Sequence, residues 1–408
     1  MKDGLKNNFF LITQVFYPDE VSTANLFTNL CSYLVEDNVE VEVWCAQPSY
    51  THFKRQPKKL VYNGIKIHYL PSTNFPKSRL SGRLTNYLTF SISVICKLIF
   101  NRDKIPVFTH TTPPSLGIII SFICSLKKRK FVYILLDIFP DGLIRLGNVS
   151  KRNLFIRLWK KMNISALKKS EKLIVIGRDM KQWLSSVYPT GLSKTEIIPL
   201  WQDDRLINPV QFETNIFIQE HQLQGKFVVQ YSGNMGMWNE MKTLGKAISM
   251  NTENVFFIFV GGGRRKNELL ENFSIDQQKN FLLLPFQSNE KLCDILTACH
   301  TSLVSLKEGL EGIAVPSKIY GIMAAGVPVI ALVPEQCEIA YIVKEENCGY
   351  VVPPNDVNGL IDAILKLKSD EQLRKKMGYN GRRAFEEKYT TRIIAREYKL
   401  LIQTLDKK

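Results

Sequence analysis

The sequence lacks several patterns that would assign a chain to a class at once. None of its eight cysteines lies in a CxxC or CxxH spacing, and they form no cluster typical of a disulfide framework. There is no GxGxxG, which disfavours a dinucleotide cofactor, and no GxxxxGK[ST], which argues against a P-loop ATPase or kinase. Internal repeats and low-complexity stretches are also missing. We therefore expect a folded protein of a reducing cytoplasm.

Long hydrophobic runs are scarce as well. Phe9–Val15 is too short and wrongly flanked for a signal peptide. Leu88–Phe100 is interrupted by Lys97, and Leu116–Leu126 follows two prolines, so neither supplies the roughly 20 apolar residues of a membrane span. Both are expected to form buried or interfacial helices.

Positive charge, by contrast, is in excess. The 54 Lys and Arg residues outnumber the 38 Asp and Glu residues, which gives a net charge of +16 and attracts nucleic acid, anionic lipid or phosphorylated substrates. The all-cationic segment Lys127–Lys130 directly follows the apolar run Leu116–Leu126, and Lys151–Lys169 spaces cations among large apolar residues. They are either solvated outer helices or basic amphipathic helices on an anionic membrane.

At 408 residues the chain is long enough for two domains. Short β-rich runs alternate with helical stretches, which predicts an α/β fold with two parallel sheets, that is, two Rossmann-like domains facing across a cleft. The expected strands are Phe9–Thr13, Val39–Cys45, Ile65–Leu70, Val107–Thr109, Phe131–Leu136, Leu173–Ile176 and Glu196–Pro199, then Phe227–Tyr231, Val255–Val260, Phe281–Leu284, Ser302–Ser305, Val327–Leu332 and Tyr350–Val352.

The irregular segment Leu200–Gln211 is the expected linker. We place an N-terminal domain at 1–205 and a C-terminal domain at 206–389. Residues 390–408 read as an amphipathic helix that caps the second domain or crosses back to the first.

Three loops in the second half carry phosphate-binding features. Two glycines follow a strand in Ser232–Gly236, three glycines and then three cations follow the next in Gly261–Lys266, and Pro316–Lys318 opens a helix. Glycine allows close backbone approach, and helix-start N–H groups favour anions. Because such loops meet at one edge of a parallel sheet, they predict a nucleoside-diphosphate pocket.

These motifs support a family resemblance. The order SGNMG, VGGG, PF, PSKIYGIMAAGVPVIA and GYVVPPND resembles the donor-binding domain of GT-B fold glycosyltransferases of the fourth sequence family. TQVFYPDEVSTANL, LLDIFPDGLIRLG, IVIGRDM and IIPLWQDD are similar to one bacterial group, which transfers fucose-type or N-acetylfucosamine-type sugars in O-antigen, capsule or colanic acid assembly. The resemblance covers nearly the whole chain.

The resemblance implies a nucleotide-sugar donor in the second domain, an acceptor in the first, retention of anomeric configuration and no bound metal or other cofactor. It implies donor contacts from the diphosphate turn, the base and sugar loops and the helix start, namely Gly233, Asn234, Gly236, Arg264, Pro285, Phe286, Gln287, Glu308, Gly309, Gly312, Pro316, Ser317, Lys318 and Tyr320.

The chain departs from the family pattern in the same region. The usual pair of glutamates is replaced by Ile313 and Gly321, with Glu311 nearby but out of register. Asn234 and Glu240 stand where the diphosphate-neutralising Arg and Lys are usual. Lys318, with Arg264 or Lys242, is then expected to supply the positive charge.

Catalytic candidates in the first domain follow its strands. Asp137 and Asp141 can orient an acceptor hydroxyl or accept its proton, and His110 is a candidate because a free imidazole is poised near neutral pH. As alternatives, Asp141 caps a helix and His110 is a satisfied loop group. Glu311 is a further catalytic candidate, and the acceptor side is expected to include Tyr17, Pro18, Asp19 and Arg178.

Together these features predict a cytoplasmic glycosyltransferase, peripherally bound to the inner face of an anionic membrane. Its partners would be a nucleotide-sugar donor and a polyprenyl-diphosphate-linked saccharide. A GT-B-fold nucleotide-sugar epimerase is one alternative. A basic nucleic-acid-binding protein is the other, although no recognised nucleic-acid motif is present and no nucleic acid partner is expected.

Overall fold

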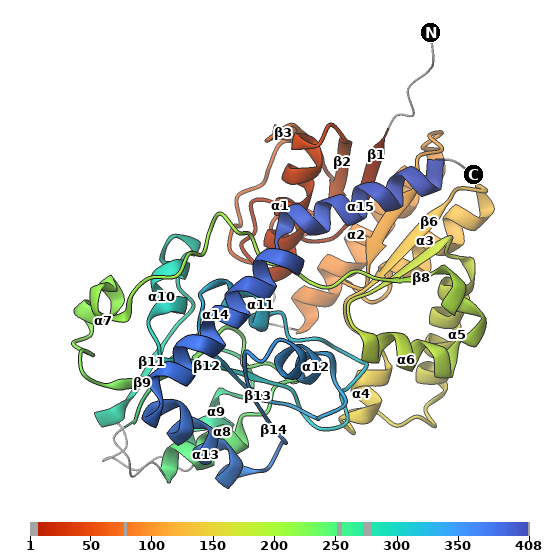
Figure 1. Ribbon diagram of the computed structural model, residues 1–408. Coiled ribbons are helices and arrows are strands. Elements are labelled where there is room, and N and C mark those ends of the chain that lie inside the picture. The colour runs from red at the N-terminus through yellow and green to blue at the C-terminus, as the bar shows by residue number, and fades with distance from the viewer. Residues whose placement is uncertain (1–6, 77–79, 251–254, 272–278, 407–408) are drawn as a thin grey trace. The chain divides into compact units, whose positions relative to one another are not determined.

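The computed structural model describes residues 7–76, 80–250, 255–271 and 279–406. The chain divides into two compact units (Figure 1). Unit 1 contains the chain up to Pro199 and from Thr391 onward, and unit 2 is Leu200–Thr390. Each unit is a largely parallel sheet covered by helices.

The sheet of unit 1 has the strand order β3-β4-β2-β1-β5-β6-β7-β8. All of its pairs are parallel except β3–β4. Its strands are β1 (Asn8–Ile12), β2 (Glu40–Cys45), β3 (Lys59–Tyr62), β4 (Ile65–Tyr69), β5 (Val107–His110), β6 (Phe131–Leu135), β7 (Lys172–Val175) and β8 (Thr195–Ile197). Its helices are α1 (Ser22–Glu36), α2 (Leu80–Phe100), α3 (Leu116–Leu126), α4 (Asp141–Arg145), α5 (Leu154–Lys169), α6 (Arg178–Val187) and α15 (Thr391–Asp406).

The sheet of unit 2 is parallel throughout, in the order β11-β10-β9-β12-β13-β14. Its strands are β9 (Phe227–Ser232), β10 (Val255–Val260), β11 (Phe281–Leu284), β12 (Thr301–Ser305), β13 (Val329–Leu332) and β14 (Gly349–Val352). Its helices are α7 (Ile216–Glu220), α8 (Lys242–Ser249), α9 (Lys266–Leu270), α10 (Leu292–Thr297), α11 (Lys318–Ala324), α12 (Glu338–Glu345), α13 (Val357–Ser369) and α14 (Glu371–Lys388).

Both sheets are built largely from buried apolar strands. Strands β6 and β10 are buried along their whole length, as expected for parallel strands covered on both faces. All thirteen strands expected from the sequence are present, with ends within two residues of their predicted positions. The predicted α/β class with two parallel sheets is therefore confirmed.

Strand β3 was not expected from the sequence. It pairs with β4 through a tight turn at Asn63-Gly64, where both residues have positive φ, 48° and 77°. Asn-Gly is the preferred pair for such a hairpin turn. This turn signal was present in the sequence, but the alternation of buried apolar and exposed polar residues in β3 is weak, because the apolar side chain of Val61 is 70% exposed.

Helix α15 returns to unit 1, the second of the two placements expected for residues 390–408. It lies along α1 (Figure 1), where Lys399 Nζ donates to the carbonyl of Asp37 at 2.9 Å and Tyr398 meets the ring of Phe9 edge-on at 6.1 Å. Unit 2 begins at Leu200, a few residues before the boundary expected between 205 and 206. Gln202 bridges to Thr390, which groups this segment with unit 2.

No helix within the described ranges combines the length and the apolar character that crossing a membrane requires. All eight cysteines are free thiols, in agreement with the missing disulfide pattern.

Helix α14 packs closely against the end of α11, and this contact depends on Gly378. A Cβ atom at Gly378 would lie 2.2 Å from the carbonyl oxygen of Gly326. We expect Gly378→Ala to lower the free energy of unfolding by about 1–3 kcal/mol, because backbone must shift to admit the methyl group. Urea denaturation followed by circular dichroism measures this. Tyr379→Ala is the matched control, since Tyr379 is 68% exposed, and an equal loss in both variants would contradict the packing argument.

Candidate functional site

The loops that follow β9 and β10 interlock at the carboxyl edge of the unit 2 sheet. The N–H of Gly233 donates to the carbonyl of Val260 at 2.7 Å, and the N–H of Met235 donates to Gly262 at 2.8 Å. A Cβ at Gly261 would lie 2.2 Å from the Gly233 oxygen, and one at Gly263 would lie 2.3 Å from the Met235 oxygen. Only glycine permits this approach, so these residues hold the two loops together.

Lys318 reaches this pair of loops from the start of α11. Its Nζ donates to the carbonyl of Asn234 at 2.8 Å and to the hydroxyl of Tyr231 at 2.7 Å, and it lies 4.0 Å from the centre of the Tyr231 ring. We name residues 232–236 and 261–263 with Lys318 the glycine cradle. The three loops singled out in the sequence therefore do meet at one place.

Burial sets the electrostatics of the cradle. The surroundings of Lys318 lower its pKa to about 7 because they offer its ammonium little solvation. An anion placed beside Nζ would favour the charged form and raise that pKa. Residue Ser317, just before α11, makes no side-chain capping bond, and the N–H groups in the first turn of a helix have no partner inside the helix.

The predicted base and sugar contacts lie on neighbouring loops of unit 2. Phe286 follows β11, is 63% exposed, and its ring lies 3.7 Å from the Cβ position of Gly262, while Gln287 donates to the Pro285 carbonyl at 3.1 Å. Glu308 is exposed, and Gly309 and Gly312 take positive φ values of 80° and 72° that suit glycine.

The remaining predicted residues of unit 2 differ in how far they are exposed. Tyr320 is fully buried, with its ring 5.1 Å from that of Tyr389, so it packs α11 against α14. Arg264 is exposed, Glu311 is half-buried and Pro316 is half-buried directly before Ser317.

The departures from the family pattern have structural explanations. Glu240 accepts from the N–H groups of Lys242 and Thr243 at 3.0 and 3.2 Å, so it caps α8. The Cβ position of Gly321 faces Leu296 at 3.3 Å, and Ile313 is fully buried. Neither position offers a carboxylate to a ligand.

Two further cations lie near the cradle: Arg265 belongs to the run of three cations noted in the sequence, whereas Lys307 was not singled out there. Arg265 pairs with Glu268 at 2.6 Å, and the pKa of Lys307 is lowered by burial and by the neighbouring Arg265. The backbone of Lys307 also donates to Trp238 at 2.8 Å, which ties the loop after β12 to the loop after β9.

In unit 1, Asp19 organises a loop. Its carboxylate accepts from the N–H groups of Ser49, Tyr50 and Thr51, each at 3.0 Å, and the residue is 4% exposed. Tyr17 stacks on Tyr62 at 3.8 Å, and its peptide bond to Pro18 is cis. Asp19 therefore shapes the predicted acceptor side by holding backbone, with its own oxygens already used.

His110 lies inside the core of unit 1. Its Nδ1 accepts from the Thr112 N–H at 3.1 Å, so Nε2 carries the proton and donates to Thr13 Oγ1 at 2.8 Å. Burial lowers its pKa to about 3, and its ring stacks on Phe27 at 4.8 Å. Both nitrogens are used within the protein, which matches the alternative of a satisfied polar group and leaves no nitrogen for the catalytic role.

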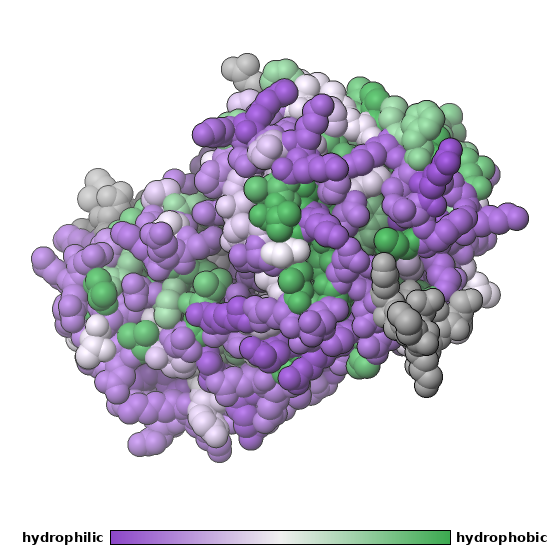
Figure 2. All heavy atoms as spheres, turned by 90° about the horizontal axis from the view of Figure 1, so that it is seen from above, coloured by the Kyte–Doolittle hydropathy of each residue, from purple (hydrophilic) through white to green (hydrophobic). Residues whose placement is uncertain are grey.

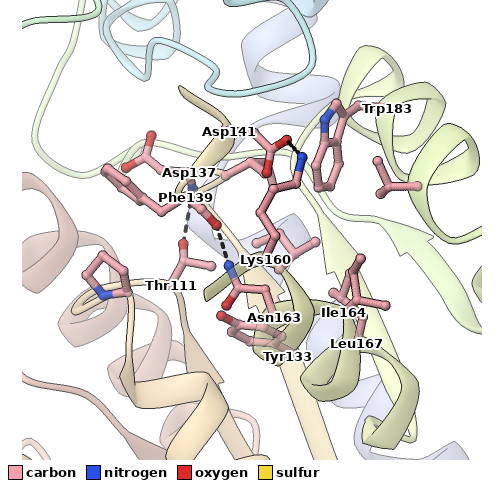
Figure 3. A pocket seen from close by; sticks show the side chains of 14 residues that line it. Thr111, Tyr133, Asp137, Phe139, Asp141, Lys160, Asn163, Ile164, Leu167 and Trp183 are labelled. Atoms are coloured by element: carbon pink, nitrogen blue, oxygen red, sulfur yellow. Dashed lines mark hydrogen bonds and ion pairs between the residues drawn. The ribbon is translucent and has the colours of Figure 1, made fainter. Parts of the chain in front are cut away.

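Asp137 and Asp141 line one pocket of unit 1 (Figure 3). Burial raises the pKa of Asp137 to about 6, and its N–H and that of Leu136 donate to Thr111 Oγ1 at 3.1 Å. Asp141 pairs with Lys160 at 2.7 Å. Asp141 is the first residue of α4, whose N-cap position is Pro140 without a side-chain capping bond, so the alternative that Asp141 caps this helix is wrong.

The rest of this pocket was not predicted. Its wall is mostly apolar and includes Phe139, Ile164, Leu167 and Trp183. Asn163 donates to the Phe139 carbonyl, while its buried Oδ1 has no hydrogen-bond partner within the described part of the chain. Arg178 begins α6 and does not line this pocket. No spacing marked Asn163 or Trp183, since they come from helices whose buried faces depend on tertiary packing.

The fold of both units is that of the GT-B glycosyltransferases. The chain is similar over 97% of its length to the Anabaena protein Alr3699/HepE in complex with UDP-glucose, with a TM-score of 0.70 and 15% identity over 99% of that chain. At this identity the likeness concerns the fold alone.

Unit 2 also carries a family signature. Residues 213–384 match the family model "Glycosyl transferases group 1", and this segment contains the whole glycine cradle. The chain is 32% identical over 245 residues to "Probable glycosyltransferase WbjE" of Pseudomonas aeruginosa, a match covering 58% of this chain and 60% of that protein. It is 36% identical over 73 residues to "O-antigen chain mannosyltransferase C" of Escherichia coli, covering 17% and 20%. The matches thus span 60% and 20% of the length of these curated relatives, less than two thirds in both cases.

The raised pKa of Asp137 predicts a pH-dependent effect of Asp137→Asn. Between the ordinary carboxyl pKa of 3.8 and about 6 the folded state binds more protons than the unfolded state, so the contribution of Asp137 to stability falls as pH rises and is lost above pH 6. Relative to the unmodified protein, the Asn variant should gain on the order of 1 kcal/mol between pH 4 and pH 7. Urea denaturation at both pH values measures this, and a difference independent of pH would contradict it.

Proposed function

We propose that this protein is a glycosyltransferase of bacterial surface polysaccharide assembly. Unit 2 binds a nucleoside-diphosphate sugar, and unit 1 binds a lipid-linked saccharide that accepts the sugar. The names of the curated relatives and the group 1 family match support the reaction class. The observation that carries the proposal is the glycine cradle, where two close backbone loops meet the ammonium of the half-buried Lys318.

The cradle suits a diphosphate leaving group. Departure of the nucleotide builds up negative charge, which Lys318 and nearby backbone N–H groups stabilise more in the transition state than in the ground state. One ammonium close to the phosphates would replace the two cations absent at Asn234 and Glu240, and no metal is required in this scheme. Phe286, exposed beside Gly262, would offer its ring to the base.

The finer assignment rests on the family resemblance. We propose transfer with retention of configuration, a sugar of fucose or N-acetylfucosamine type, and a polyprenyl-diphosphate-linked acceptor at the inner face of the cytoplasmic membrane. In unit 1, Asp137 and Asn163 are the side chains proposed to position the acceptor hydroxyl, because they lie in the same pocket.

A thermal-shift screen with UDP-, GDP- and dTDP-sugars tests the donor site. A ligand that binds only the folded state raises the melting temperature, so one nucleotide should stabilise the protein and the others should not. Product analysis with the stabilising sugar then separates the outcomes. Sugar transferred to a lipid-linked acceptor supports the proposal. Free epimerised nucleotide sugar would replace it with the epimerase, and no shift with any nucleotide would remove it.

Lys318 gives a sharper test. A nucleotide sugar has no group that titrates near neutral pH, so its affinity should fall by up to tenfold per pH unit above pH 7, as Lys318 loses the proton that the complex needs. Lys318→Met should weaken binding, lower turnover by on the order of a hundredfold and abolish this pH dependence. Lys344→Met, at an exposed ion pair with Glu335, is the matched control. Isothermal titration at pH 6.5–9 measures the affinities, and unchanged pH dependence in Lys318→Met would exclude this role.

A further inference from the structure

Three helices of unit 1 form one layer with an unusual outer face. Helix α3 packs against α2 on one side and against α5 on the other. The contacts include Lys127 Nζ, just after α3, on the carbonyl of Ile99 and Lys169 Nζ lying 5.1 Å from the ring of Phe122. The outer surfaces of α2, α3 and α5 are therefore neighbours.

This layer exposes an exceptional amount of apolar surface. It carries eleven of the twenty-three exposed large hydrophobic side chains in the described part of the chain, with exposed fractions from 42% to 82%. They are Leu84, Leu88, Ile92, Ile99 and Phe100 on α2, Phe122 and Leu126 on α3, and Leu154, Phe155, Leu158 and Met162 on α5. The residues of α2 recur at helical spacing, so they form one stripe. Exposed apolar surface gathered in this way marks an interaction site.

The charge of the layer has one sign only. Helices α2, α3 and α5 contain no Asp or Glu at all. Exposed cations lie beside the apolar residues, namely Lys128, Lys151, Arg152, Arg157, Lys161, Lys168 and Lys169. Figure 2 shows hydrophobic side chains next to strongly hydrophilic ones on its right-hand side, where Figure 1 places α3 and α5. The face is complementary to an anionic, partly apolar surface.

We infer that the outer face of α2, α3 and α5 is the membrane-docking surface of the protein, which takes anionic phospholipid head groups on its cations and inserts its apolar side chains into the interface. A second copy of the chain fits less well, because a symmetric contact would press this cationic face against itself. Nucleic acid would leave the exposed Leu, Ile and Met side chains without apolar partners. A bilayer satisfies both features.

Helix α5 connects this face with the pocket of unit 1. Lys160, Asn163, Ile164 and Leu167 line the pocket, and at 3.6 residues per turn they lie on the side of α5 opposite to Phe155, Leu158 and Met162. The inference deepens the proposed function, because a lipid-linked acceptor would reach that pocket from the bilayer on which α5 lies.

Vesicle co-sedimentation of the full chain tests the surface. We expect binding to phosphatidylcholine vesicles that contain phosphatidylglycerol, much weaker binding to phosphatidylcholine alone, and a loss of affinity as salt rises. Arg157→Glu, Lys161→Glu and Lys168→Glu combined should weaken binding by tenfold or more. Leu88→Gln, Phe155→Gln and Leu158→Gln combined should do the same while keeping good helix formers on α2 and α5.

Matched controls lie on exposed positions of unit 2. Lys246→Glu, Lys376→Glu and Arg383→Glu change the net charge equally, and Ile216→Gln with Tyr379→Gln removes exposed apolar side chains elsewhere. Equal losses in the control and α5 charge variants would overturn the inference. Vesicle binding that is unchanged in both test variants would also overturn the inference. The same holds for an apolar variant that still binds vesicles but loses self-association or DNA binding at the same salt.

The same preparations separate this inference from the proposed function. Vesicle binding without any nucleotide-sugar thermal shift would leave the docking surface standing and remove the glycosyltransferase proposal. A nucleotide-sugar shift without vesicle binding would overturn the docking surface alone. Circular dichroism melting shows whether each variant is folded.

Discussion

The close approach of the two backbone loops after β9 and β10 is the constraint on which the candidate donor site depends. The carbonyl groups of Gly233 and Met235 lie so close to Gly261 and Gly263 that a side chain on either of these two glycines would clash with them. This approach fixes the Asn234 carbonyl, which in turn holds the ammonium of Lys318. Lys318 is half-buried and its ammonium is poorly solvated, so the charged form becomes more favourable when an anion arrives. Sequence, packing and electrostatics thus agree at this one point.

The sequence predicted most of the fold because parallel sheets leave a strong local signal. Strands such as Val255–Val260 are buried on both faces and therefore read as continuous apolar runs. Strand β3 was lost since it lies at the sheet edge, where only alternate residues are half-buried. The division between the units was placed a few residues late, because the bridge from Gln202 to Thr390 joins segments far apart in the chain.

The candidate site was only partly predictable for a related reason. Glycines and a helix-start lysine can be recognised locally, and they do meet in the cradle. Polar residues at strand ends cannot be sorted in the same way, since the carboxylate of Asp19 and Nε2 of His110 are engaged by partners that lie far away in the sequence. Likewise Glu240 serves as a helix cap, and the pocket contacts of Asn163 and Trp183 arise only when α5 and α6 pack on the sheet.

Helix α5 has its two faces committed to different surroundings, the pocket on one side and the exterior on the other. An α-helix with its side chains is about 10 Å thick. With the outer face resting on a bilayer, the pocket would stand at roughly that height above the head groups. This fixed distance from the head groups would decide which part of a lipid-linked acceptor reaches the pocket. It would present to the pocket those units of a lipid-anchored chain that lie nearest to the anchor, and longer chains would extend past it.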